Sequence, residues 1–246
     1  MAQVTSLWRH PIKSHGREEV ASTHLIAGQT MPGDRVWAVA HETSKADGSK
    51  WVPCANFNRV SKVPQLMAMT AKLEDATGIV SLSHPKLGDL SFDPDGDISG
   101  FLEWVCPIMP EDRAQSKRMV KVPNRGMTDS DFPSVTLCNI ASHREVEHKL
   151  GMDLSIHRWR GNIWMDSVPA WEEFKWMGKD IRIGDAILRP LERTDRCPST
   201  QSNPKTGMHD ADTLGALDSF GHRDFSVRAQ VIQGGSIVVG SKVEVL

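Results

Sequence analysis

The chain has 246 residues, of which 39% are hydrophobic and 24% are charged, and its formal net charge is −2. These values are typical of a folded globular protein and exclude a disordered or fibrous chain. The near-neutral charge, without any basic run, argues against a nucleic-acid partner. Because the sequence shows neither an apolar leader nor a membrane-crossing stretch, we expect no targeting segment and no membrane association.

Short stretches that favour β-strands, separated by glycine-containing turns, make up most of the chain. Their alternation predicts a mainly β fold with a few helices, built as barrels or a sandwich. The length allows one large β-rich domain or two smaller ones. The predicted strands are residues 4–9, 35–40, 66–73, 79–83, 181–183, 186–191, 227–232 and 242–246.

Two helices and one long loop are predicted between these strands. Ser142 and Glu145 have the spacing of a capping box, and Gly151 stands where a helix would end. A second helix is predicted around residues 213–220. Residues 107–133 are polar, contain several prolines and have no clear periodicity, which predicts a long loop of the kind that is often functional or mobile.

The four cysteines are far apart and include no C-x-x-C pair. This spacing argues against a disulfide framework and a structural zinc site, and it favours a reducing cytoplasm. The histidine spacings predict no metal site. No phosphate-binding loop, dinucleotide-binding glycine pattern or hydrolase elbow follows a predicted strand, so the sequence lends these activities no support.

The segment Thr194–Thr200 places Cys197 between Arg196 and Pro198 in a loop rich in hydroxyl groups. A thiolate is a soft metal ligand, and a neighbouring positive charge favours the ionised thiol. Cys197 is therefore a candidate ligand or nucleophile. The alternative is a small buried core residue, which is common for a free cysteine. The position between a strand and a Pro/Gly turn favours the first interpretation, and the other three cysteines lack such a setting.

Three further polar clusters contain groups that could bind an anion. Lys13 and Ser14 lie in a turn after the first strand, and Arg35 leads into another strand. Arg158 and Arg160 are two apart and would share one face of a strand. Each group alone is equally typical of solvated surface. Together they would surround one thiolate with phosphate- and heterocycle-binding groups: Lys13, Arg35, Arg158, Arg160, Asn162 and Arg196.

The order of these motifs resembles the MOSC family, named for the C-terminal domain of molybdenum cofactor sulfurase. Within it, the chain is similar to two-part proteins with an N-terminal MOSC-type β-barrel, the group of the amidoxime-reducing component. The motifs that carry the resemblance are P-I-K-S at 11–14, G-D-R-V-W at 33–37, R-W-R-G-N-I at 158–163, R-I-G-D at 182–185 and R-C-P-S-T at 196–200. Gly161 stands where the family has proline.

The resemblance implies an N-terminal MOSC-type β-barrel over residues 1–106, packed on a MOSC β-barrel domain over residues 107–246 that includes the loop 107–133. It also implies a molybdenum cofactor, with Cys197 as metal ligand and catalytic residue. It implies neither pyridoxal phosphate nor an iron–sulfur cluster in this chain. The cofactor-binding residues carried over from the family are Lys13, Ser14, Arg35, Arg158, Arg160, Asn162, Thr194, Arg196 and Thr200.

The activity implied by the resemblance is reduction of small N-hydroxylated or N-oxide compounds at a Cys-ligated molybdenum centre. Electrons would come from a separate ferredoxin-, flavodoxin- or cytochrome-like protein. The alternative is a carrier that holds the cofactor, or a persulfide on Cys197, and exchanges sulfur with a partner protein. A third hypothesis is a barrel that keeps the fold and binds nothing.

Overall fold

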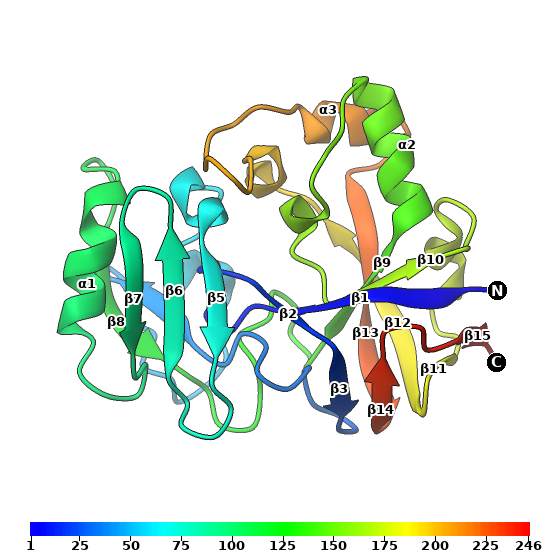
Figure 1. The fold of residues 1–246 in the computed structure, drawn as a ribbon, viewed down its shortest axis with the longest axis horizontal. Helices are drawn as coiled ribbons and strands as arrows, with labels where there is room; N and C mark the ends of the chain where they lie inside the picture. The colour runs from blue at the N-terminus through cyan, green and yellow to red at the C-terminus, as the bar shows by residue number, and fades with distance from the viewer.

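The computed structural model describes residues 1–246, and its largest element is a curled sheet of eight strands (Figure 1). In spatial order these are β15 (Val243–Val245), β11 (Ile181–Ile183), β12 (Ala186–Asp195), β13 (Asp224–Gln233), β9 (Val135–Asn139), β10 (Ile163–Asp166), β1 (Gln3–Arg9) and β2 (Glu18–Val20). We call this sheet, with the helices that pack on it, the large-sheet lobe. The prediction of a mainly β fold with a few helices is confirmed.

Alternation of buried and exposed side chains explains the central strands of this sheet. In β12, Ala186, Leu188 and Pro190 are buried while the residues between them are partly exposed. Successive side chains of a strand point to opposite faces, so one face of β12 is apolar and packs inward. The same face of the neighbouring strands completes a core of 20 buried residues.

The first strand closes the curl of the sheet. The Val4 amide donates to the Ser241 carbonyl (2.9 Å), and the Gly240 amide donates to the Val4 carbonyl (2.8 Å). In addition, β3 (Ser22–Leu25) pairs with β14 (Gly235–Val238). Strands β1 and β3 of the N-terminal region thus bond to residues of the C-terminal half, β1 within the large sheet and β3 in a separate pair with β14. Both termini lie on the same side of the molecule (Figure 1).

A second, smaller lobe has its own core. It contains the sheet β5 (Thr70–Leu73), β6 (Val80–His84) and β7 (Gly88–Phe92), the pair β4 (Ala38–His41) and β8 (Ser116–Val120), and helix α1 (Ser99–Val105). A cluster of 15 buried residues holds it together, including Phe101 of α1 stacked on Phe92 of β7. We call it the small-sheet lobe; it lies opposite the large-sheet lobe in Figure 1.

The segment 107–133 is not wholly a loop, contrary to the sequence prediction. It contains β8, which pairs antiparallel with β4. Only Val120 of this strand is buried, so the strand has no apolar alternation that the sequence could reveal. The division of the chain at residues 106 and 107 stays a prediction, while β1 and β2 show that early residues also belong to the large sheet.

Helix α2 (Ile140–Leu150) ends as predicted but begins earlier than predicted. Gly151 has φ 65°, the left-handed conformation of a C-terminal cap. At the start, however, the Asn139 side chain caps the helix by accepting from the Ala141 amide (2.9 Å). The capping box at Ser142 is wrong, because the Ser142 hydroxyl is buried and donates to Glu173 (2.7 Å).

The structure contains the other predicted strands and the second predicted helix, in several cases with different ends. The second predicted helix is α3 (Thr213–Asp218), and the strand predicted at 66–73 is only β5, since Pro64–Ala68 forms a 3₁₀ helix. The strand predicted at 35–40 begins at Ala38 because Arg35 has φ 51° and cannot continue a strand. No helix of the protein has the length and apolar character that crossing a membrane requires.

Gly161 packs so closely against Cys138 that a side chain would not fit there. A Cβ added at Gly161 would lie 2.1 Å from the Cys138 Sγ and 3.5 Å from the Cys138 Cβ. Cys138 is fully buried on β9. This contact is a physical reason for glycine at a position where the resembled family has proline.

We expect Gly161→Ala to lower the free energy of unfolding by about 1–3 kcal/mol, because the overpacked core must shift. Adding Cys138→Ala removes the Sγ, so the double variant should be more stable than Gly161→Ala alone. Urea unfolding of the parent, both single variants and the double variant measures this coupling. Simple addition of the two single effects would contradict the close contact.

His15, in the turn after β1, is fully buried and lies edge-on to Phe101. Its Nδ1 donates to the Lys13 carbonyl (2.8 Å), and its Nε2 has no partner. Burial lowers the pKa of His15 from 6.5 to about 4. The folded protein therefore holds this ring neutral at a pH where the unfolded chain would protonate it.

Stability should fall as the pH drops from about 6.5 to about 4, since the unfolded state then binds a proton that the folded state does not. His15 contributes at most about 3 kcal/mol to this loss. His15→Asn keeps a donor for the Lys13 carbonyl and should flatten the dependence of stability on pH. The part that remains comes from the other histidines whose pKa values burial lowers, which are His10, His84, His143, His157 and His222. Urea unfolding at a series of pH values tests this, and an unchanged slope in the variant would count against it.

Candidate functional site

One cavity lies where the two lobes meet, with a volume of about 980 Å³ including the space open to solvent at its mouth. The structure brings most of the predicted site residues to its wall, although their roles stay predictions. Those on the wall are Lys13, Ser14, Arg35, Arg158, Arg160, Thr194, Arg196 and Cys197.

Asn162 and Thr200 do not reach the wall of this cavity. The Asn162 side chain donates to the Trp8 carbonyl (3.1 Å) and accepts from the Thr136 amide (3.0 Å), so it ties β1 to β9. The buried Thr200 hydroxyl pairs with Thr213 of α3 (2.6 Å). Both side chains hold segments of the cavity in place from behind.

The turn after β1 places Lys13 and Ser14. Ser14 has φ 66°, which reverses the chain sharply. Lys13 is only 4% exposed, and its Nζ donates to the Met127 carbonyl (2.7 Å) and to Asp129 (2.5 Å). Burial lowers the pKa of Lys13, and the Asp129 carboxylate opposes that shift. The Lys13 charge is therefore largely compensated within the protein.

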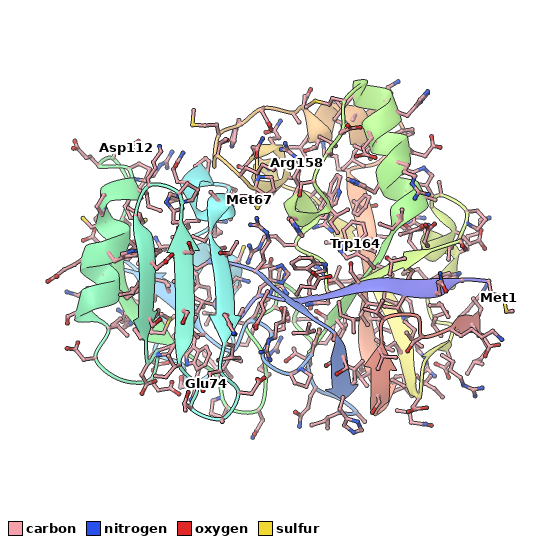
Figure 2. All side chains as sticks on the ribbon, viewed as in Figure 1. Met1, Met67, Glu74, Asp112, Arg158 and Trp164 are labelled. Carbon is pink, nitrogen blue, oxygen red and sulfur yellow. The ribbon has the colours of Figure 1, made fainter.

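Arg158 and Arg160 lie on the wall, but not on a strand as their spacing suggested. Residues Ile156–Trp159 form a 3₁₀ helix, and Arg160 follows in the left-handed conformation. Arg158 lies toward the small-sheet lobe in Figure 2 and pairs with Asp210 (2.5 Å). Its Nε is buried without a partner.

Arg160 is partly buried and forms no ion pair with a carboxylate. Its Nη2 donates to the Gly16 carbonyl (3.2 Å), while its Nη1 is buried and has no partner. Burial and the nearby charges of Arg35 and Arg17 lower the pKa of Arg160 to about 9. A bound anion would relieve this unfavourable charge, so the site around Arg160 suits an anionic ligand.

Cys197 stands at the cavity with an exposed thiol, which argues against its alternative as a buried core residue. It joins the end of β12 to the 3₁₀ helix Pro198–Gln201, and its Sγ lies 3.0 Å from the Ser199 hydroxyl. Next to it, Arg196 donates to the Phe225 and Trp159 carbonyls and to the Ser226 hydroxyl. These bonds orient the Arg196 guanidinium without neutralising it.

Several wall residues were missed by the sequence interpretation, and Cys54 and Arg59 are two of them. Cys54 begins the 3₁₀ helix Cys54–Asn56 of the small-sheet lobe, and Arg59 follows it, with Nη1 3.7 Å from the Cys54 Sγ. Nothing in the sequence around Cys54 connects it with Cys197. Only the packing of the two lobes brings this second thiol to the cavity.

The cavity wall is strongly cationic. A wall of this kind, with an accessible thiol on it, fits a ligand that combines an anionic group with a soft metal. The charged residues on the wall are Lys13, Arg35, Arg59, Arg158, Arg160, Arg196 and Arg228, against Asp129 and Asp195.

Comparison with known proteins identifies two domains. Residues 1–100 match the MOSC N-terminal beta barrel domain, and residues 126–244 match the MOSC domain. The sheet that curls around the 20-residue core belongs mostly to the second match.

Individual relatives are distant. The chain is 24% identical to mitochondrial amidoxime-reducing component 1 of Danio rerio, over 83% of this chain and 70% of that protein. It is 23% identical to the protein of the same name from Mus musculus, over 84% of this chain and 67% of that protein. The crystal structure of the YuaD protein from Bacillus subtilis is similar over 100% of this chain and 96% of that one, with 13% identity and a TM-score of 0.48. Since the two domain matches together span most of the sequence, the chain belongs to the MOSC family.

Proposed function

We propose that this protein binds a molybdenum cofactor and reduces small N-hydroxylated or N-oxide compounds. The observation that carries the proposal is the exposed Cys197 thiol on a cavity where Arg160 forms no ion pair and keeps a buried nitrogen without a partner. The MOSC match and the names of the distant relatives support it. When bound, the cofactor would supply a redox-active molybdenum that accepts the oxygen of the N–O group.

The chain itself would hold and orient this group. Cys197 would provide the protein thiolate to the metal, and Arg160 and Arg158 have buried nitrogens free to bind a pterin or phosphate. Asn162 and Thr200 would act from behind the wall by fixing the segments they bond to. The cofactor contacts we propose on the wall are Lys13, Ser14, Arg35, Arg158, Arg160, Thr194 and Arg196.

The reaction needs two electrons and two protons for each N–O bond broken, giving the amine or amidine and one water. We propose that a separate ferredoxin-, flavodoxin- or cytochrome-like protein supplies the electrons. We also propose a cytoplasmic location, on the ground that the cysteine spacing in the sequence favours a reducing compartment.

A carrier that passes sulfur through a persulfide on Cys197 is the second candidate. The exposure of the thiol favours it, since a partner protein could reach it. Turnover separates the two functions. A reductase should convert benzamidoxime to benzamidine with a reduced viologen as electron donor, whereas a carrier loaded with cofactor should not.

Cys197→Ala should lose molybdenum while remaining folded. The side chain is exposed and the Sγ hydrogen-bonds only to Ser199, so its removal should change the free energy of unfolding by less than about 0.5 kcal/mol. Metal and pterin contents are measured on protein from a host that makes the cofactor. Cys106→Ala, at an exposed cysteine away from the cavity wall, is the matched control and should keep its metal. Equal molybdenum in parent and Cys197→Ala would remove Cys197 as ligand.

Arg160→Gln should weaken cofactor retention roughly ten- to a hundredfold, because a charge-assisted contact is lost. Without cofactor, the variant should melt at the same temperature as the parent or higher, since a buried unpaired charge has been removed. Pterin content after dialysis and thermal melts of both forms give these values. The control is Arg144→Gln, at an exposed position on α2. A cofactor-free variant that is clearly less stable, with retention unchanged, would show a purely structural role.

A further inference from the structure

Arg59 lies on the cavity wall, and most hydrogen-bond donors of its guanidinium have no partner in the protein. It comes from the small-sheet lobe, between the 3₁₀ helices Cys54–Asn56 and Pro64–Ala68. It forms no ion pair, and its one side-chain hydrogen bond is the long contact of Nη1 with the Cys54 Sγ at 3.7 Å. A half-buried guanidinium normally finds a carboxylate or several carbonyls, so its free donors indicate a missing partner.

The other cations of the wall are already engaged within the protein. Ion pairs join Lys13 to Asp129, Arg35 to Asp34, Arg158 to Asp210 and Arg228 to Glu192. Arg196 uses its donors on two carbonyls and a hydroxyl. Arg160 has a free buried nitrogen, which the proposed cofactor would bind. Arg59 is therefore the cation that remains for another ligand.

A second cavity extends the positive surface outward from Arg59. This cavity, of about 600 Å³ including open space, shares Arg59 with the first and has no acidic residue on its wall. Lys62 and Arg113 lie on it; Arg113 pairs with Asp112 (3.8 Å), whereas Lys62 is exposed without an ion pair. Clefts lined by one sign of charge attract ligands of the opposite sign, so an anion would be drawn toward Arg59.

We propose that Arg59 binds a carboxylate of the substrate, and hence that the substrates are N-hydroxylated or N-oxide compounds that also carry a carboxylate. This inference rests on the proposed reductase function. One free guanidinium matches one carboxylate, because its planar fork can donate two parallel hydrogen bonds to the two oxygens. The apolar Val60 and Trp159 also lie on the first cavity and would contact the body of such a substrate.

The test compares benzamidoxime with 4-carboxybenzamidoxime, using cofactor-loaded protein and a reduced viologen. Arg59→Gln should lower the ratio of kcat/KM for the carboxylated over the neutral compound by roughly ten- to a hundredfold, through KM rather than kcat. Arg59→Lys should restore part of the ratio. Arg182→Gln, at an exposed arginine on β11 away from both cavities, is the control and should leave the ratio unchanged.

Calorimetric binding of 4-carboxybenzamidoxime without electron donor is the second measurement. If Arg59→Gln loses this binding while its molybdenum and pterin contents are unchanged, the assignment of Arg59 as carboxylate site is supported. This holds even if the parent shows no turnover, and in that case only the reductase proposal fails. If the parent reduces both compounds and Arg59→Gln changes neither the ratio nor the binding, the Arg59 assignment is overturned and the reductase stands. Loss of pterin from Arg59→Gln would place Arg59 in the cofactor site and would also overturn the inference.

Discussion

Pairing of β1 inside the large sheet is the constraint on which the site depends. The strand runs antiparallel to β10 on one side and β2 on the other, and its first residues bond to residues 240–243. The turn with Lys13 and Ser14 begins two residues after β1 ends, so the pairing sets its position. The Asn162 side chain, bonded to Trp8 and Thr136, then fixes the segment after Arg160 beside it.

Collecting cations on one wall is unfavourable unless each charge is compensated. The fold compensates most of them with a carboxylate from a different segment, as for Lys13 and Arg158. Where no carboxylate is present, main-chain carbonyls accept, as those of Trp159 and Phe225 do from Arg196. Arg160 and Arg59 are the exceptions. Binding of an anion to a cation that has no ion-pair partner would therefore stabilise the folded protein.

The two lobes contribute different chemical groups to the cavity. The large-sheet lobe supplies Cys197, Arg196 and the arginines after α2, all on short segments that follow strands or helices of a packed core. The small-sheet lobe supplies Cys54 and Arg59 from the segment between β4 and β5. The sheets on both sides hold the loops of the cavity. In such an arrangement the loop residues can differ between proteins that share the fold.

The sequence by itself determined the strands with strict alternation, such as β12, the end of α2 at Gly151, and the loop that exposes Cys197. These features depend on residues close together in the chain. Tertiary structure decided the rest. Strand β8 buries one side chain, so only its pairing with β4 defines it, and Arg158 and Arg160 leave the strand geometry because Arg160 is left-handed. Cys54 and Arg59 reach the cavity only because the two lobes pack together, and local sequence carries no record of such long-range contacts.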